Sequence, residues 1–139
     1  MIGTILQGEK MYDFKEFYGI GEELSRTNDE AHIRSAINRD YYALFGESRK
    51  YLVEVKGKIH LTTKKGIHGK VCGTLMNSND PTEEYVGKML FKLIPIRGAV
   101  DYEWKDYDFN YIKDIFPQIQ KNIKKGLESI EYLNNKYNN

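Results

Sequence analysis

An apolar side chain recurs every three or four positions between residues 110 and 137. This spacing places the apolar side chains on one face of an α-helix, because one turn takes about 3.6 residues. A stripe of this length predicts a helix that packs lengthwise against other helices, and Pro117 predicts a bend near its start. The positions on this face are Ile112, Ile115, Phe116, Ile119, Ile123, Leu127, Ile130 and Leu133.

A second stripe predicts another long helix that begins after Thr27 and runs to about Val55. Thr27 and Glu30 have the spacing of a capping box, which predicts where this helix begins. Gly57 is expected to end it. The apolar positions between these limits are Ile33, Ile37, Tyr41, Leu44, Phe45 and Leu52.

Three further segments have helical spacing. Residues 13–25 and 62–77 both contain glycines, which weaken a helix. A better-marked helix has Asp80 as its N-cap and Pro81 as its first residue, and Pro95 should kink it. We therefore predict an all-α, up-and-down four-helix bundle with a short extra N-terminal helix and a kinked, long C-terminal helix.

Length and composition narrow the class of protein. The 139 residues are expected to form a single domain, residues 1–139. The single cysteine, Cys72, excludes an internal disulfide and favours a reducing compartment. No apolar run approaches the ~18 residues of a membrane span, so we expect a soluble, cytoplasmic protein without membrane contact. The net charge of +1 gives no overall signature of nucleic-acid binding, although residues 54–73 hold five lysines and one glutamate.

The helix over residues 30–55 has a second face, offset from its apolar stripe. Arg39, Tyr42, Ala43 and Gly46 share this face at i, i+3, i+4 and i+7. Small residues let another helix approach closely, and arginine and tyrosine supply hydrogen-bond donors there. Two interpretations are open. The face forms a tightly packed helix pair, within the chain or in a homodimer, with Arg39 in an ion pair. Alternatively, it lines a cleft that binds an anion or an RNA phosphate.

Histidines and charged pairs give weaker signals. His68 lies on the flank of the third expected helix, either as a surface or hydrogen-bonding residue or as a general acid or base near neutral pH. His32 and His60 have no partner at metal-ligand spacing, so we predict no metal and no cofactor. Arg97 and Asp101 are spaced for an i, i+4 ion pair.

The segment RSAINRDYYALFGESRKYL (34–52) resembles the long helix of the HEPN superfamily. The likeness is to the small stand-alone HEPN proteins usually encoded beside a minimal nucleotidyltransferase, where this helix reads roughly Ser-Arg-Ala-Tyr-Tyr-Ala-x-Phe-His. It continues with a histidine that opens the next helix, here His68. It continues again with Arg-x-x-Ala-Asp-Tyr, here the end of LFKLIPIRGAVDY (90–102), and covers about residues 30–135.

The resemblance implies a four-helix bundle, commonly homodimeric, from a group of RNA-cleaving toxins and defence proteins. Catalytic members carry an arginine and a polar residue, matched here by Arg39 and Asp40, and a histidine four to six residues further on. In this chain those positions hold Phe45, Gly46 and Glu47. Glycine removes the acid–base group and leaves room. Either the site is degenerate or His68 takes the place of the missing histidine.

We therefore expect a HEPN component of a toxin–antitoxin or antiviral defence system, acting on or binding RNA through a dimer cleft centred on Arg39. Activity as a metal-independent ribonuclease stays open, because Gly46 breaks the motif. The alternative is a non-catalytic homodimeric adaptor that binds a nucleotidyltransferase or another defence protein; a third is a structural helical protein without a ligand. The expected catalytic residues are Arg39, Asp40 and His68, and the expected binding residues are Tyr42, Arg97, Asp101 and Tyr102.

Overall fold

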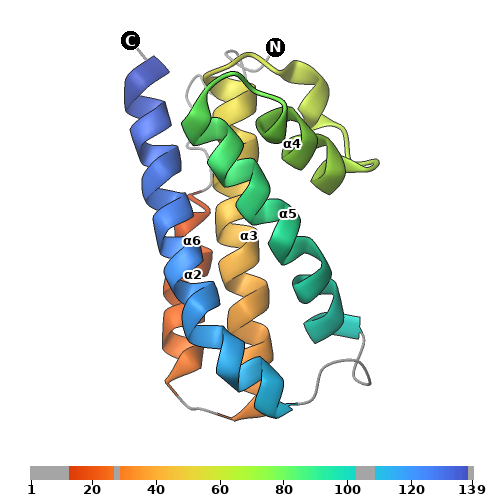
Figure 1. Cartoon of the computed structure of the whole chain (residues 1–139), viewed down its shortest axis with the longest axis vertical. Helices are drawn as coiled ribbons and strands as arrows, with labels where there is room; N and C mark the ends of the chain where they lie inside the picture. The colour runs from red at the N-terminus through yellow and green to blue at the C-terminus, as the bar shows by residue number, and fades with distance from the viewer. Residues whose placement is uncertain (1–12, 27–28, 103–108, 138–139) are drawn as a thin grey trace.

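The computed structural model describes residues 13–26, 29–102 and 109–137. Within these residues the chain is helical and contains no strand, which confirms the all-α class. Figure 1 shows the long helices side by side, with the direction of the chain alternating between them. The elements are α2 (Lys15–Ser25), α3 (Glu30–Glu54), the 3-10 helix η1 (Ile59–Thr62), α4 (Ile67–Met76), α5 (Pro81–Tyr102) and α6 (Phe109–Tyr137).

Helix α3 is the central element and contacts every other helix named above. In Figure 1 α5 and α6 flank it, α2 lies beside its lower half, and the short α4 lies against α5 near its upper end. The apolar stripe of α6 faces this core as its spacing predicts, with Ile112, Ile123 and Leu133 fully buried. Residues from the neighbouring helices complete the core, among them Ile37, Leu44, Leu75, Val86 and Leu90.

The leading helix α2 packs along α3 as a member of the bundle. The two helices run antiparallel, because Phe14 lies against Gly46 and Gly21 lies against Ala36 and Asp40. The backbone N–H of Phe14 also donates to the Glu47 carboxylate at 3.0 Å. The expected short extra helix therefore packs against α3 between about Ala36 and Glu47.

The starts of two helices need comparison with the sequence, and that of the third expected helix is wrong. Helix α3 begins at Glu30 and its N-cap is Asp29, whose carboxylate accepts from the N–H of His32 at 2.9 Å. Aspartate is among the preferred N-cap residues, and the capping box expected of Thr27 lies outside the described residues. The third helix begins at Ile67, because Gly66 has a left-handed backbone with φ +63° that an α-helix cannot continue through. The observed helix therefore covers only the later part of the expected range 62–77.

The start of α5 follows the prediction closely. Asp80 accepts from the N–H of Thr82 at 2.8 Å and from that of Glu83 at 3.3 Å, and Pro81 is the first helical residue. The helix is continuous through Pro95 to Tyr102. Likewise α6 continues through Pro117.

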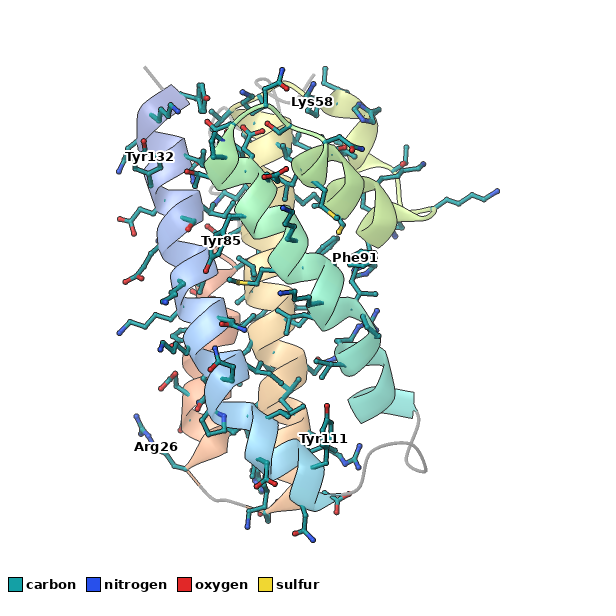
Figure 2. All side chains as sticks on the ribbon, in the orientation of Figure 1. Arg26, Lys58, Tyr85, Phe91, Tyr111 and Tyr132 are labelled. Carbon is teal, nitrogen blue, oxygen red and sulfur yellow. The ribbon has the colours of Figure 1, made fainter. Side chains whose placement is uncertain are left out.

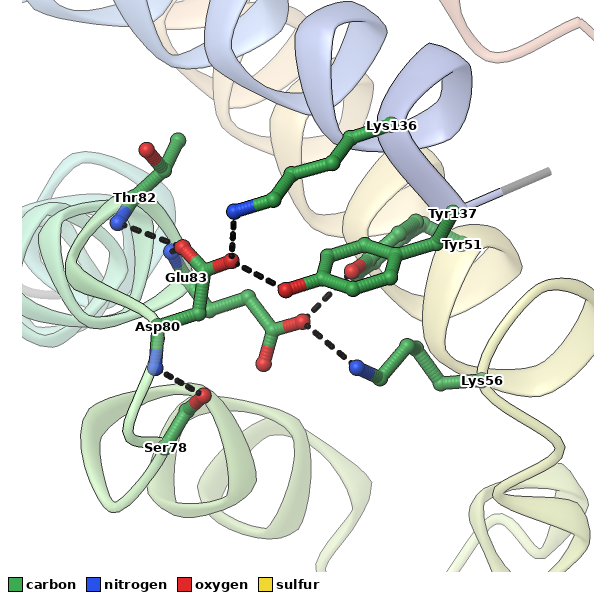
Figure 3. Close-up of polar contacts among 8 residues, drawn as sticks. All are labelled: Tyr51, Lys56, Ser78, Asp80, Thr82, Glu83, Lys136 and Tyr137. Carbon is green, nitrogen blue, oxygen red and sulfur yellow. Dashed lines mark hydrogen bonds and ion pairs between the residues drawn. The ribbon is translucent and has the colours of Figure 1, made fainter.

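Polar side chains join the start of α5 to the ends of α3 and α6 (Figure 3). Asp80 accepts from the Lys136 ammonium at 3.0 Å and from the Tyr137 phenol at 2.5 Å. Beside it, the buried Glu83 accepts from the Tyr51 phenol at 2.5 Å and pairs with Lys56 at 3.4 Å. These contacts satisfy both acids and fix the last turn of α6 to the bundle.

Candidate functional site

Helix α2 packs on the part of the Arg39 face around Gly46, and Arg39 itself is exposed beside it. The Phe14 ring packs directly on Gly46, where an added Cβ would overlap the ring. Ala43 is fully buried, and the Arg39 guanidinium lies 5.6 Å from the centre of the Phe17 ring. Of the two interpretations of this face, the structure therefore has the packed helix pair within the chain. Arg39 makes a cation–π contact there in place of the expected ion pair, and Phe14 fills the room that Gly46 leaves.

Asp40 lies beneath the same helix and is fully buried. Its carboxylate packs against Gly21, and neither oxygen has a hydrogen-bond partner in the part of the chain that the structure describes. Burial, and then the nearby charge of Glu22, raises the pKa of Asp40 to about 8. Asp40 is therefore protonated at neutral pH and sealed from solvent, so in this arrangement it does not face a ligand.

A different group of predicted residues comes together where α3, α4 and α5 meet. We call it the His68 cluster, and it consists of Tyr41, Tyr42, Phe45, His68 and Arg97. The imidazole of His68 stacks on the Phe45 ring with centroids 4.1 Å apart, and Tyr42 meets it edge-on at 5.8 Å. The Tyr41 phenol oxygen lies 2.6 Å from Nδ1 of His68. Three aromatic rings thus hold the imidazole in one orientation.

Arg97 supplies the positive charge of the His68 cluster. Its guanidinium carbon lies 5.5 Å from the centre of the Tyr41 ring and 5.6 Å from that of Tyr42. Burial, followed by the charges of Arg97 and Arg49, lowers the pKa of His68. The imidazole is therefore neutral at pH 7 and lies beside a permanent cation. Such a pair suits a negatively charged ligand better than a positive one.

Hydrogen bonds from Arg49 fix the segment that leads into the His68 cluster. Arg49 donates from Nε to the carbonyl of Leu61 at 2.7 Å and from Nη2 to the carbonyl of Thr63 at 3.1 Å. These bonds tie η1 to α3 just before α4 begins. The loop that carries Lys64 and Lys65 is thereby held next to the His68 cluster, and both lysines are exposed. Arg97 and Arg49 therefore act on the partly exposed imidazole, and two more positive charges lie in the loop that leads into its helix.

The expected site residues thus fall into separate places. His68, Tyr42 and Arg97 come together, whereas Asp40 is buried under α2 and Arg39 is exposed beside Phe17 of that helix. Asp101 and Tyr102 lie in the last turn of α5, but their side chains are outside the described residues, as is the expected Arg97–Asp101 pair.

Two members of the cluster, Tyr41 and Phe45, were expected only as core residues. Both are buried, so that expectation is confirmed. Their contact with His68 is what places them in the site, and that contact depends on how α4 packs against α3. No periodicity within one helix carries that information.

Comparisons with known proteins give no match: no protein-family model fits the chain, and neither the curated proteins nor the solved structures contain a similar one. In the described residues no three His, Cys, Asp or Glu side chains gather in a way that could hold a metal ion. None of the described helices combines the length and the apolar character that crossing a membrane requires.

Proposed function

We propose that this chain is a HEPN-type component of a toxin–antitoxin or antiviral defence system that binds RNA at the His68 cluster. The proposal combines the sequence resemblance with a single structural observation. That observation is the convergence of the imidazole, two tyrosine rings and the Arg97 guanidinium between α3, α4 and α5. Single-stranded RNA is bound through base stacking on aromatic rings and through phosphate contacts with cations.

The location of the cluster supports RNA over an apolar ligand. His68, Tyr42 and Arg97 are each partly exposed, so they can meet a ligand without the bundle opening. The exposed lysines Lys64 and Lys65 lie in the loop that precedes α4 and add to the local positive charge. Because the net charge is only +1, this attraction is local and should weaken quickly as salt rises.

A pair of arginine variants tests the proposal. Binding of a fluorescent single-stranded RNA is measured by polarisation for the wild type, Arg97→Ala and Arg39→Ala, at low and moderate salt. Both substitutions remove one positive charge from the surface of the same bundle, so Arg39→Ala is the matched control. We expect Arg97→Ala to weaken binding about tenfold and Arg39→Ala to change it less than about twofold.

Two other results would contradict the proposal. A larger loss of RNA binding in Arg39→Ala than in Arg97→Ala would place the binding site on the Arg39 face. No RNA binding by the wild type would reject the proposal. The same samples are incubated with RNA and EDTA, and we expect no self-sufficient cleavage, since the HEPN histidine position holds Gly46.

A second function, that of a homodimeric adaptor for a nucleotidyltransferase or another defence protein, is favoured by a different observation. Tyr85, Phe91 and Tyr132 are exposed on α5 and α6 (Figure 2). A shallow groove of about 440 Å³ lies between the two helices and is lined by Thr82, Tyr85, Lys125, Glu128, Ser129 and Tyr132. Aromatic residues in such places are common at protein interfaces.

Sedimentation velocity tests the adaptor function. The wild type is compared with Tyr85→Ser/Tyr132→Ser, and we expect a dimer that the double variant dissociates. A wild type that stays monomeric at all concentrations would reject the homodimer.

A further inference from the structure

The Tyr41 phenol has one hydrogen-bond partner in the described part of the chain, the Nδ1 of His68 at 2.6 Å. Only 1% of Tyr41 is exposed, so water does not replace that partner. Burial is the main cause that raises the pKa of Tyr41, and the phenol therefore keeps its proton. A buried O–H donor with no acceptor is costly, whereas a phenol oxygen with spare lone pairs costs much less.

These facts decide between the two neutral forms of His68. If Nδ1 carried the proton, it would donate to the phenol oxygen, and the phenol O–H would be buried with nothing to accept it. If Nε2 carries the proton, the phenol donates to Nδ1 and the imidazole keeps its Nε2–H for a ligand. The second form should outnumber the first by about tenfold or more.

We infer that Tyr41 is a positioning residue that fixes His68 as its Nε2–H tautomer, so that the imidazole offers a ligand a hydrogen-bond donor and no acceptor, and the His68 cluster binds a phosphate group through donated hydrogen bonds. This inference rests on the proposed function, because it assigns the chemistry of the same site. The donors are Nε2–H of His68, the Arg97 guanidinium and the Tyr42 phenol. Three donors that converge in this way match a phosphate, whose oxygens accept hydrogen bonds.

The inference also explains why the site should bind RNA rather than cut it. Cleavage of RNA without a metal needs a base that takes a proton from the attacking hydroxyl. The lone pair of His68 is on Nδ1 and is already occupied by the Tyr41 phenol. Protonation of His68 would break that hydrogen bond and place a second cation beside Arg97. His68 therefore acts as a donor to the phosphate.

Nitrogen NMR of ¹⁵N-histidine-labelled protein tests the tautomer directly. The wild type is compared with Tyr41→Phe and, as the matched control, Tyr42→Phe, which removes one phenol oxygen from the neighbouring residue. Exposed His60 in each sample is the internal reference. We expect His68 to be almost wholly Nε2–H in the wild type and in Tyr42→Phe, and to move toward the His60 distribution in Tyr41→Phe. A wild-type His68 that is mainly Nδ1–H, or doubly protonated at pH 7, would overturn the inference.

Titration with inorganic phosphate and with the single-stranded RNA tests the ligand. We expect both to shift the Nε2 signal of His68 without protonating Nδ1, and Tyr41→Phe to weaken phosphate binding severalfold while leaving the fold intact by circular dichroism. If RNA binds through Arg97 but His68 does not respond, this inference fails and the proposed function stands. If neither phosphate nor RNA binds while the tautomer is as expected, both the ligand assignment and the proposed function fail.

Discussion

Asp80 at the start of α5 and Asp40 in the middle of α3 are both carboxylic acids buried from solvent, with exposed fractions of 9% and 0%. Asp80 accepts hydrogen bonds from Lys136, Tyr137 and two backbone N–H groups. Asp40 accepts no hydrogen bond in the described residues, and the charge of Glu22 disfavours its ionised form. One residue type is therefore buried in two opposite environments within the same bundle.

The pKa values of the two acids follow these environments. Burial by itself would raise the pKa of Asp80, but the bonds from Tyr137, Lys136 and the backbone outweigh it and lower the pKa below its usual value. Burial of Asp40 meets no such opposition and raises its pKa to about 8. The partners of a buried acid, more than its burial, therefore decide which protonation state the fold stabilises. At neutral pH Asp80 ties elements together as an anion, and Asp40 lies under α2 as a neutral acid.

The largest expected effect is the loss of the Asp80 side chain. Asp80→Ala removes the N-cap of α5 and the bonds to Lys136 and Tyr137, and should lower the free energy of unfolding by about 3 kcal/mol. Asp80→Asn is the control, because asparagine caps a helix as well as aspartate but cannot pair with Lys136. It should cost about half as much. Urea unfolding measures both, and equal losses would mean that the charge accounts for the whole effect and the cap contributes nothing.

Asp40 should give the protein an unusual pH dependence. Its folded pKa of about 8 exceeds the ordinary 3.8, so between these values the folded protein holds a proton that the unfolded chain has lost. The free energy of unfolding should therefore fall as pH rises, by at most about 1.4 kcal/mol per pH unit. Asp40→Asn should abolish this slope when urea unfolding is repeated from about pH 5 to about pH 7. An identical slope in wild type and variant would show that water reaches Asp40.

The packing of α2 on α3 offers a smaller test. In Gly46→Ala the new methyl group meets the Phe14 ring, so α2 must shift, and the free energy of unfolding should fall by about 2 kcal/mol. The shift should also admit water to Asp40 and reduce its pH slope. Gly69→Ala is the control, because open space surrounds that glycine in α4. A Gly46 variant as stable as the wild type would contradict the close contact with Phe14.

The smallest effect should come from the phenol of Tyr137. Tyr137→Phe removes one bond to Asp80 and keeps the ring that Lys56 approaches at 3.9 Å. We expect a loss of about 0.5–1 kcal/mol in thermal or urea unfolding, because Lys136 still pairs with Asp80 and Tyr137 is partly exposed. Tyr132→Phe, on the same helix, is the control and should be neutral. A loss as large as that of Asp80→Ala would mean that Tyr137 alone carries the network.

The fold was largely predictable from the sequence, and the site only in part. The stripes of α3 and α6 and the Asp80–Pro81 start of α5 are local patterns, and they predicted these helices well. The start of α4 was missed because a glycine can either continue a helix or stop it, and only the backbone at Gly66 shows which. The sequence predicted Arg39 and His68 in one site, yet Arg39 contacts Phe17 and His68 stacks on Phe45.

What the sequence determined by itself is the helical class, the buried stripes and most of the helix starts, because hydrogen bonds and side-chain spacing within a few residues set them. The tertiary structure decided which side of α3 each helix covers. It placed Phe14 on Gly46 and left Asp40 without a hydrogen-bond partner among the described residues, and it brought His68 and Arg97 to Tyr41. These contacts join residues far apart in the chain, and they depend on how whole helices pack, which no local pattern records.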